Sequence, residues 1–320
     1  MNDSPVVGSA PRPFELDLIE PPMALAVPNV SEGRDESAIE ALVDAVRATG
    51  VQVADVHSDP DHNRSVLTMA ADPLTLIEGM VALAHACVEY IDIRWHEGVH
   101  PRIGSLDVAP IVALTEDDMP LAQETAIALA DRIGEEVGIP VFRYGAIASD
   151  PNRVRPSDFR SDGYDQLDEL VRESELIPDA GPPRMHPTAG ATLVGARPPL
   201  IAWNVWLEDG SLTDARAIAA RVRERDGGLP GVRALGLYLP DAGQNQVSMN
   251  LEDYLRTSPR QAVAAVRREA ERVGAIAGRS ELVGLIPRGA LADASIPELG
   301  LRGFRPGQLL EARIPALRRF

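Results

Sequence analysis

Histidines concentrate in the first third of the chain, where five of the six lie between residues 57 and 100. The densest stretch, residues 94–107, reads RWHEGVHPRIGSLD and holds two histidines, two acids and two arginines. An imidazole can accept and donate protons near neutral pH, because its unperturbed pKa is ~6.5. Glycine and proline in this stretch indicate a loop, where catalytic groups are commonly placed. The stretch is the first candidate for a catalytic site.

Residues 96–100 also match the zinc-protease pattern H-E-x-x-H. That pattern binds zinc because a helix places both imidazoles on one face. Here Gly98 weakens a helix, and Pro101 disfavours the helical conformation at His100. We therefore expect a loop without a metal. A zinc-dependent hydrolase that uses His96 and His100 is the alternative.

Two further segments carry polar side chains. Residues 55–65, DVHSDPDHNRS, join two expected strands, and Asn63 and Arg64 begin the second of them, so their side chains project from a rigid base. Residues 179–192, DAGPPRMHPTAGAT, lie between the two halves of the chain. The second segment fits either an interdomain linker or a wall of a ligand cleft between subdomains.

Composition excludes several classes of function. The net charge is −17, which disfavours binding to nucleic acid or anionic membranes. All 31 basic residues are arginine, so chemistry that needs a lysine ammonium group, such as a P-loop or a Schiff base, is excluded. An anionic ligand then needs a local cluster of arginines.

The remaining features predict a cytoplasmic protein. The single cysteine, Cys87, excludes an intrachain disulfide and fits a reducing compartment. Residues 1–22 contain five prolines and resemble a flexible leader rather than a signal peptide. We find no run of ~18 apolar residues that would span a membrane.

Strand and helix patterns alternate twice along the chain. In the first half we expect strands at 23–28, 51–56, 63–70, 106–114 and 139–147, with helices from 35, 72, 115 and 164. In the second half we expect strands at 200–207, 232–240, 246–252 and 281–287, with helices from 211 and 258. Each half opens with the order strand, helix, strand, strand, helix, strand. This predicts an α+β fold with two ferredoxin-like (βαββαβ-type) subdomains.

Several motifs in order resemble the formiminotransferase domain family. They are PNVSEG at 28–33, the segment 55–65, HPRIG at 100–104 followed by Asp107, and GAT and GAR within 190–197. The resemblance implies subdomains at 23–197 and 198–320 with a substrate cleft or tunnel between them. It also implies transfer of a formimino group from N-formimino-L-glutamate to tetrahydrofolate in histidine degradation, and a homodimer.

The resemblance also implies site residues. The family's catalytic histidine precedes Pro-Arg, which here is His100. The candidates for substrate and folate binding are Gly181, Pro182, Pro183, Arg184, Met185, His186, Pro187, Thr188, Ala189, Gly190, Asn63, Arg64 and Arg102. Arg197 is a further candidate for binding an anion. A carboxylate is expected to orient the histidine ring, and Asp59, Asp61 and Asp107 are the candidates. His57 is a further candidate for a supporting group.

Two positions depart from the family pattern. Val99 stands where many members have glutamate, and His57 stands where the animal members have a carboxylate. These departures keep open a second alternative, a folate-binding relative without catalysis. The chain is also too short for the cyclodeaminase domain of the bifunctional animal enzymes, so the next step would need a separate enzyme.

Overall fold

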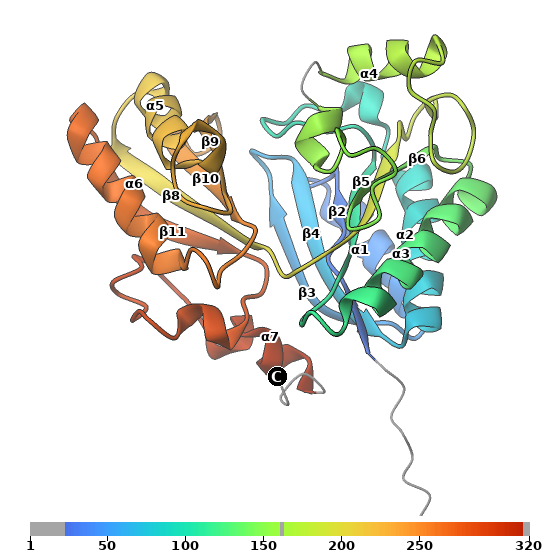
Figure 1. The fold of residues 1–320 in the computed structure, drawn as a ribbon, viewed down its shortest axis with the longest axis horizontal. Helices are drawn as coiled ribbons and strands as arrows, with labels where there is room; N and C mark the ends of the chain where they lie inside the picture. Colours follow the sequence, from blue (N-terminus) through green and yellow to red (C-terminus); the bar gives the residue numbers. More distant parts are fainter. Residues whose placement is uncertain (1–22, 161–162, 316–320) are drawn as a thin grey trace, which may run out of the picture.

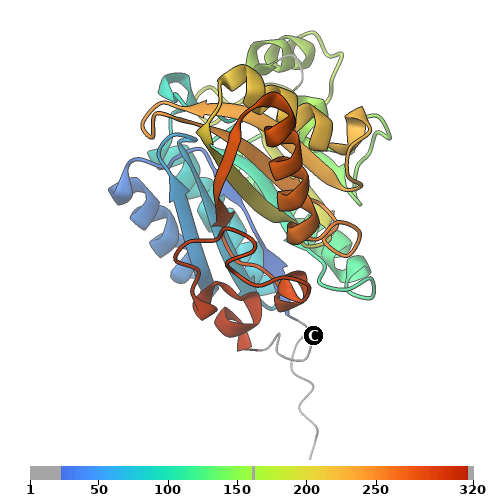
Figure 2. The same ribbon diagram turned by 90° about the vertical axis from the view of Figure 1, so that its left-hand side faces the viewer.

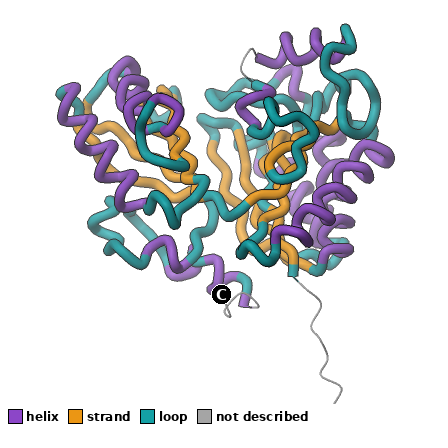
Figure 3. Tube along the Cα trace, viewed as in Figure 1, coloured by secondary structure: helices purple, strands orange, loops and turns teal. Residues whose placement is uncertain are grey.

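The computed structural model describes residues 23–160 and 163–315, which form two α+β bodies side by side (Figure 1). Strands β1 to β7 form the first sheet and strands β8 to β11 the second. Most of the helices lie on the outer flank of each sheet (Figure 3). The predicted mixed α+β class is confirmed. The leader expected at residues 1–22 lies outside the described residues.

The first sheet is built around β4. Its strands are β1 (Ala24–Ala26), β2 (Asn29–Val30), β3 (Gln52–Asp59), β4 (Arg64–Ala71), β5 (Leu106–Val112), β6 (Val141–Gly145) and β7 (Thr192–Arg197). β4 pairs with β3 on one side and with β1 and β2 on the other, and β5 follows, all antiparallel. β7 and β6 then run parallel beyond β5. β3 and β4, which hold His57, Asp59 and Arg64, are therefore neighbours, and β1 and β2 separate β4 from β5, which holds Asp107.

Helices cover both faces of the first sheet unequally. α1 (Glu36–Arg47), α2 (Pro73–Tyr90) and α3 (Met119–Arg132), which continues as a π-helical turn, share one apolar core with β1, β4 and β5. α4 (Gly163–Arg172) packs on the opposite face with Phe142 and Phe159. Cys87 is buried in the first core. The opposite face is otherwise left free for contacts with the second body.

The second sheet has the strand order β11-β8-β10-β9 and is antiparallel throughout. Its strands are β8 (Ile201–Asp209), β9 (Val232–Leu239), β10 (Gln244–Leu251) and β11 (Ile276–Val283). α5 (Leu212–Val222) and α6 (Pro259–Val273) cover one face, and the short α7 (Leu310–Arg313) follows near the end of the described chain. In the view of Figure 2 α5 and α6 lie in front of their sheet, with the first body behind.

The helix starts expected at 35, 72, 164, 211 and 258 are confirmed to within a residue, whereas the helix expected from 115 begins only at Met119. Asp72 accepts a hydrogen bond from the Thr75 amide, and Pro73 occupies the first turn of α2. Ser211 and Ser258 cap α5 and α6 in the same way, each with a reciprocal side-chain bond three residues later. These side chains satisfy amide groups that a helix start leaves unpaired, so a short local sequence is enough to place each start.

The two sheets face each other with polar side chains between them. Alternation along β8 sends Trp203 and Val205 into the helix-covered core, so Asn204 and Trp206 lie on the free face. Gln246 and Glu281 pair in register with Trp206 and Asn204 and share that face. Asn204 and Gln246 are buried although they belong to no apolar core. Gln246 Oε1 lies 3.4 Å from His62 Nε2, so this polar face meets the first body.

The structure corrects two expected elements. A strand at Thr192–Arg197, β7, was missed, and it belongs to the first sheet. Residues 181–190 therefore lie inside the first body, and the chain passes to the second sheet between Arg197 and Ile201. The strand expected at 281–287 is β11, which starts earlier and ends at Val283, because Gly284 adopts a left-handed φ of 75°.

Within the two described stretches, none of the helices combines the length and the apolar character that a bilayer crossing requires.

Candidate active site

The loop between α2 and β5 carries His100. Residues 96–100 follow a short 3-10 turn at Ile93–Trp95 and are irregular, so the loop prediction is confirmed. The two imidazoles of the H-E-x-x-H match therefore do not share a helix face. Among the described residues, no group of three or more His, Cys, Asp or Glu side chains is placed to hold a metal ion.

A backbone carbonyl orients the ring of His100. The ring nitrogen Nδ1 lies 2.7 Å from the carbonyl oxygen of Pro101. A carbonyl only accepts hydrogen bonds, so Nδ1 carries the proton of the neutral ring and Nε2 presents a lone pair. We expected a carboxylate from Asp59, Asp61 or Asp107 in this place, and the structure has the carbonyl instead. The Pro101 carbonyl thus orients the ring with Nε2 free to act as a base, and it does so without placing a full negative charge next to Nδ1.

The surroundings of His100 favour its neutral form. Burial holds the pKa of His100 well below its ordinary value of 6.5, and the positive charges of Arg64 and Arg160 lower the pKa further. The negative charge of Asp107 opposes this shift, and His62 adds to it. In the free protein near neutral pH, His100 is therefore an uncharged base.

A buried carboxylate holds two arginines beside this base. Asp107 is fully buried, and its Oδ2 pairs with Arg64 Nη1 at 2.5 Å and with Arg160. Its Oδ1 accepts a hydrogen bond from the Ile103 amide at 2.8 Å. Burial alone would raise the pKa of Asp107, but the two arginines and the amide hold it well below its usual range. The cluster carries a net positive charge next to His100.

Asn63 and its neighbours fix the path of the loop. The Asn63 side chain accepts from the Gly33 amide at 2.9 Å and donates to the Glu97 carbonyl at 3.0 Å, with a φ of 45°. His96 Nε2 lies 2.7 Å from the Asn63 carbonyl, and Arg102 donates to the His96 carbonyl. Both ends of the Asn63 amide are thus engaged by backbone groups of the protein.

The second body contacts the site at the turn between β3 and β4, which belongs to the first body. His62 is buried, its ring lies 5.9 Å from that of His100, and its Nε2 lies 3.4 Å from Gln246 Oε1. Asp61 accepts from the Asp241 amide at 2.7 Å, whereas Asp59 accepts from the His62 amide within the turn. Asp59 therefore stabilises the turn itself, and Asp61 joins the turn to the second body at Asp241.

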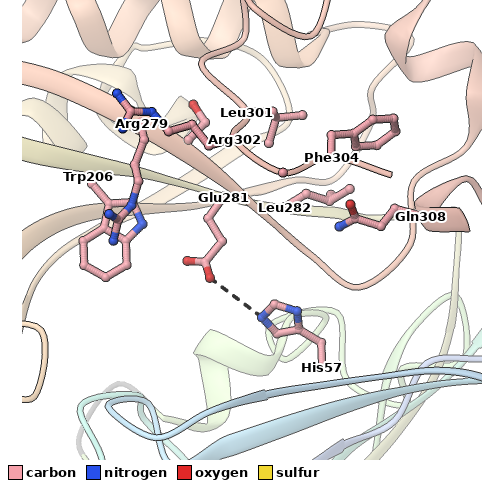
Figure 4. A pocket seen from close by; sticks show the side chains of 11 residues that line it. His57, Trp206, Arg279, Glu281, Leu282, Leu301, Arg302, Phe304 and Gln308 are labelled. Atoms are coloured by element: carbon pink, nitrogen blue, oxygen red, sulfur yellow. Dashed lines mark ion pairs between the residues drawn. The ribbon is translucent and has the colours of Figure 1, made fainter. Parts of the chain in front are cut away.

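A pocket lies beside this turn, between β3 and the second body. It has a volume of about 260 Å³, and its lining includes His57, Trp206, Arg279, Glu281 and Arg302. Figure 4 shows His57 and Glu281 pointing toward each other across it, with their Nε2 and Oε1 atoms 4.0 Å apart. The sequence had placed His57 near a site but gave no indication of its neighbours.

Residues 181–190 pack against the loop that carries His100. The Ser105 amide donates to the Ala189 carbonyl, and the Ile93 amide donates to the Thr188 carbonyl. Met185 is buried in the small core of Ile103 and Phe142, whereas Arg184 is exposed. The segment thus supports the loop from the first body, and its structure does not bring Arg184 to Asp107.

Sequence reasoning missed Arg160, Gln246 and Glu281. Arg160 follows a connection of polar residues, 53 positions from Asp107, and Gln246 and Glu281 lie in the other half of the chain. For Gln246 the sequence held one local signal: a polar residue stands at a strand position whose side chain points to a buried face. Arg160 carried no comparable signal.

Comparison with known proteins identifies relatives over most of the chain. A glutamate formimidoyltransferase of Thermoplasma acidophilum is 40% identical over 294 residues, covering 90% of this chain and 96% of that protein. One of Streptococcus pyogenes serotype M1 is 36% identical and covers 84% and 90%. The formimidoyltransferase-cyclodeaminase of Rattus norvegicus is 37% identical, but this chain spans 51% of its length.

Family models match both bodies. Residues 23–197 match the formiminotransferase domain, N-terminal subdomain, and residues 202–296 match the formiminotransferase domain. The two matches together cover most of the sequence and include His100, Arg64, Asp107 and the second sheet. The chain therefore belongs to the formiminotransferase family.

Proposed function

We propose that this protein transfers the formimino group of N-formimino-L-glutamate to tetrahydrofolate, with His100 moving the protons. The products are glutamate and 5-formimidoyltetrahydrofolate. The observation that carries the proposal is the contact of His100 Nδ1 with the Pro101 carbonyl, which leaves Nε2 as a base beside the positive cluster of Arg64 and Arg160. Family membership supports the same reaction.

The reaction needs one group that both takes and gives a proton. The secondary ring amine of the folate attacks the amidine carbon and must lose a proton. The glutamate nitrogen must gain one when it leaves. A neutral His100 takes the first proton at Nε2 and, as a cation, returns it to the glutamate nitrogen. Binding of an anionic substrate near Arg64 and Arg160 would offset their charge and stabilise the protonated ring.

Both substrates carry carboxylates, which arginine binds with a planar fork. Arg64 and Arg160 adjoin His100, and Arg102 lies in the same loop, so these residues serve the reacting end of the site. Residues Gly181–Gly190 are assigned to folate contacts, next to the loop. Asn63 is assigned to positioning, because its amide is engaged by Gly33 and Glu97.

The fold supports this assignment. The orders β3-β4-β2-β5 and β11-β8-β10-β9 are those of two ferredoxin-like subdomains, at 23–197 and 198–320, and the substrate cleft lies between their polar faces. The small-molecule substrates are formiminoglutamate and tetrahydrofolate, the acceptor. A homodimer and a cytoplasmic location complete the proposal.

A coupled assay tests the proposed function directly. Purified protein should release glutamate from N-formimino-L-glutamate only when tetrahydrofolate is present, in equal amounts with 5-formimidoyltetrahydrofolate. Release of glutamate without folate would indicate hydrolysis instead. Folate binding without release would indicate a relative that has lost catalysis, which the departure at Val99 kept open.

Chelation should leave the transfer rate unchanged. The irregular path of residues 96–100 separates the two imidazoles from a shared helix face, and the Asn63 carbonyl already engages His96 Nε2. We expect less than one zinc per chain by elemental analysis and full activity after dialysis against a strong chelator. Activity that disappears on chelation and returns with one equivalent of zinc would overturn this expectation.

Arg184→Glu should weaken tetrahydrofolate binding up to about fivefold, and more for longer polyglutamate tails, because a reversed charge repels the tail carboxylates. Stability should change by ~0.5 kcal/mol or less, since Arg184 is exposed. Titration of wild type and variant with tetrahydrofolate measures the effect. Arg172→Glu, an exposed arginine on α4, is the control. Equal affinities for wild type and Arg184→Glu would remove this arginine from the folate site.

A further inference from the structure

The pocket between β3 and β11 combines charges of both signs with aromatic walls. Arg279 and Arg302 supply two guanidinium groups, Glu281 supplies a carboxylate, and Trp206 and Phe304 supply flat apolar surface. Figure 4 shows Trp206 and Arg279 at one end, Phe304 and Gln308 at the other, and Glu281 between them above His57. A ligand for this pocket should carry anionic groups and a hydrogen-bond donor.

The guanidinium groups are suited to carboxylates. Arg279 Cζ lies 4.3 Å from the centroid of the Trp206 ring, so the ring supports the flat face of the guanidinium and leaves its N–H edge available. The protein as a whole carries a charge of −17, which repels anions. An anionic small molecule therefore needs a local group of arginines, and Arg279 and Arg302 both line this pocket.

The carboxylate of Glu281 is fixed in position. Asn204 Nδ2 and Gln246 Nε2 donate to its Oε2 at 3.3 and 3.5 Å, while Oε1 points toward His57. The side chains of His57 and Glu281 are 25% and 29% exposed, so a ligand can reach them. Two buried amides that hold one accessible carboxylate indicate an acceptor for a ligand N–H rather than a surface charge.

A chain of contacts links the pocket to His100: Gln246 contacts both Glu281 and His62, and the His62 ring lies 5.9 Å from that of His100. His57 and Asp59 point to the same face of β3, and Arg64, which pairs in register with Asp59, shares that face. Arg64 in turn contributes its charge to the surroundings of His100. A ligand anchored at Arg279 and Arg302 can therefore extend past His57 toward the reacting centre.

We propose that this pocket binds the dicarboxylate end of the formimino donor, an N-substituted glutamate. Its two carboxylates pair with Arg279 and Arg302, its substituted nitrogen donates to Glu281, and its formimino end extends past His57. The assignment rests on the proposed function. Tetrahydrofolate also ends in a glutamate, but a cavity of about 260 Å³ lies below the ~300–1,000 Å³ typical of drug-sized ligands and suits the smaller substrate.

Binding of N-formimino-L-glutamate alone, without folate, tests the proposal by calorimetry. Arg279→Gln and Arg302→Gln should each raise the Kd of the donor about tenfold or more, because each loses a charge-assisted hydrogen bond. The Kd of tetrahydrofolate should stay within twofold. Arg256→Gln, an exposed arginine of the same body outside the pocket, should leave both constants unchanged. Unaltered melting temperatures confirm that the variants fold.

Two results would overturn the proposal. Donor affinity that both pocket variants leave unchanged would show that the carboxylates bind elsewhere. A rise in the Kd of tetrahydrofolate with donor affinity unchanged would assign the pocket to the folate tail. Failure of the proposed function is recognised separately, as wild-type protein that binds the donor but does not transfer its formimino group to folate.

Discussion

His100→Ala should lower kcat by about 10²–10⁴, because the variant loses the group that takes and returns the proton. Tetrahydrofolate affinity should stay near the wild-type value, since the assigned folate segment 181–190 is held by its own contacts with residues 93–105. Steady-state kinetics and a separate folate titration measure the two effects. Turnover that survives in His100→Ala would assign proton transfer to another base, such as His57 or His62.

The pH profile provides an independent check of the role of His100. The base must be neutral to accept a proton, so kcat/KM of the wild type should fall as the pH drops through the pKa of His100. Because burial and the two arginines lower that pKa, the acid limb should lie below pH 6.5. The control His85→Gln, an exposed position on α2, should keep the wild-type profile. If the acid limb of the wild type lies above pH 6.5, the pKa of His100 is not lowered and the proposal of a neutral base is wrong.

Asp107→Asn should reduce the free energy of unfolding by about 3–5 kcal/mol. The substitution keeps the shape of the side chain but leaves Arg64 and Arg160 together without their counter-charge. Urea denaturation measures the loss, with Asp117→Asn, an exposed acid, as a control that should change stability by ~0.5 kcal/mol or less. If Asp107→Asn is as stable as this control, the two arginines do not need the carboxylate of Asp107 for the stability of the fold.

The stabilising effect of Asp107 should also depend on pH. Its pKa is lower in the folded protein than its ordinary value of 3.8. The contribution is therefore complete above that ordinary value and is lost as the pH falls toward the folded pKa. The difference in stability between wild type and Asp107→Asn should be constant near neutral pH and shrink below about pH 4. If the difference in stability between wild type and Asp107→Asn grows on acidification, the pKa of Asp107 is not lowered in the folded protein.

Elements with local signals could be predicted from the sequence. Asp72 with Pro73, and Ser258 with Pro259, start helices because capping and a fixed proline φ act within one turn. Gly98 and Pro101 likewise predicted that residues 96–100 form a loop. β7 was missed because its short run, TLVGAR, follows a segment rich in glycine and proline. Only pairing with β5 and β6 makes that run a strand.

Local sequence was sufficient for the family resemblance, for most of the alternation of strands and helices, and for His100 as the candidate base. The surroundings of that base came from the three-dimensional fold: Arg160 beside Asp107, the Pro101 carbonyl at Nδ1, and Gln246 of the second sheet behind His62. The physical reason is the separation along the chain over which each kind of interaction acts. Capping and side-chain periodicity act between residues a few positions apart. Burial, ion pairing and the pKa of His100 depend instead on distances in space between residues far apart in the chain, such as Asp107 and Arg160, 53 positions apart, and His62 and Gln246, 184 positions apart.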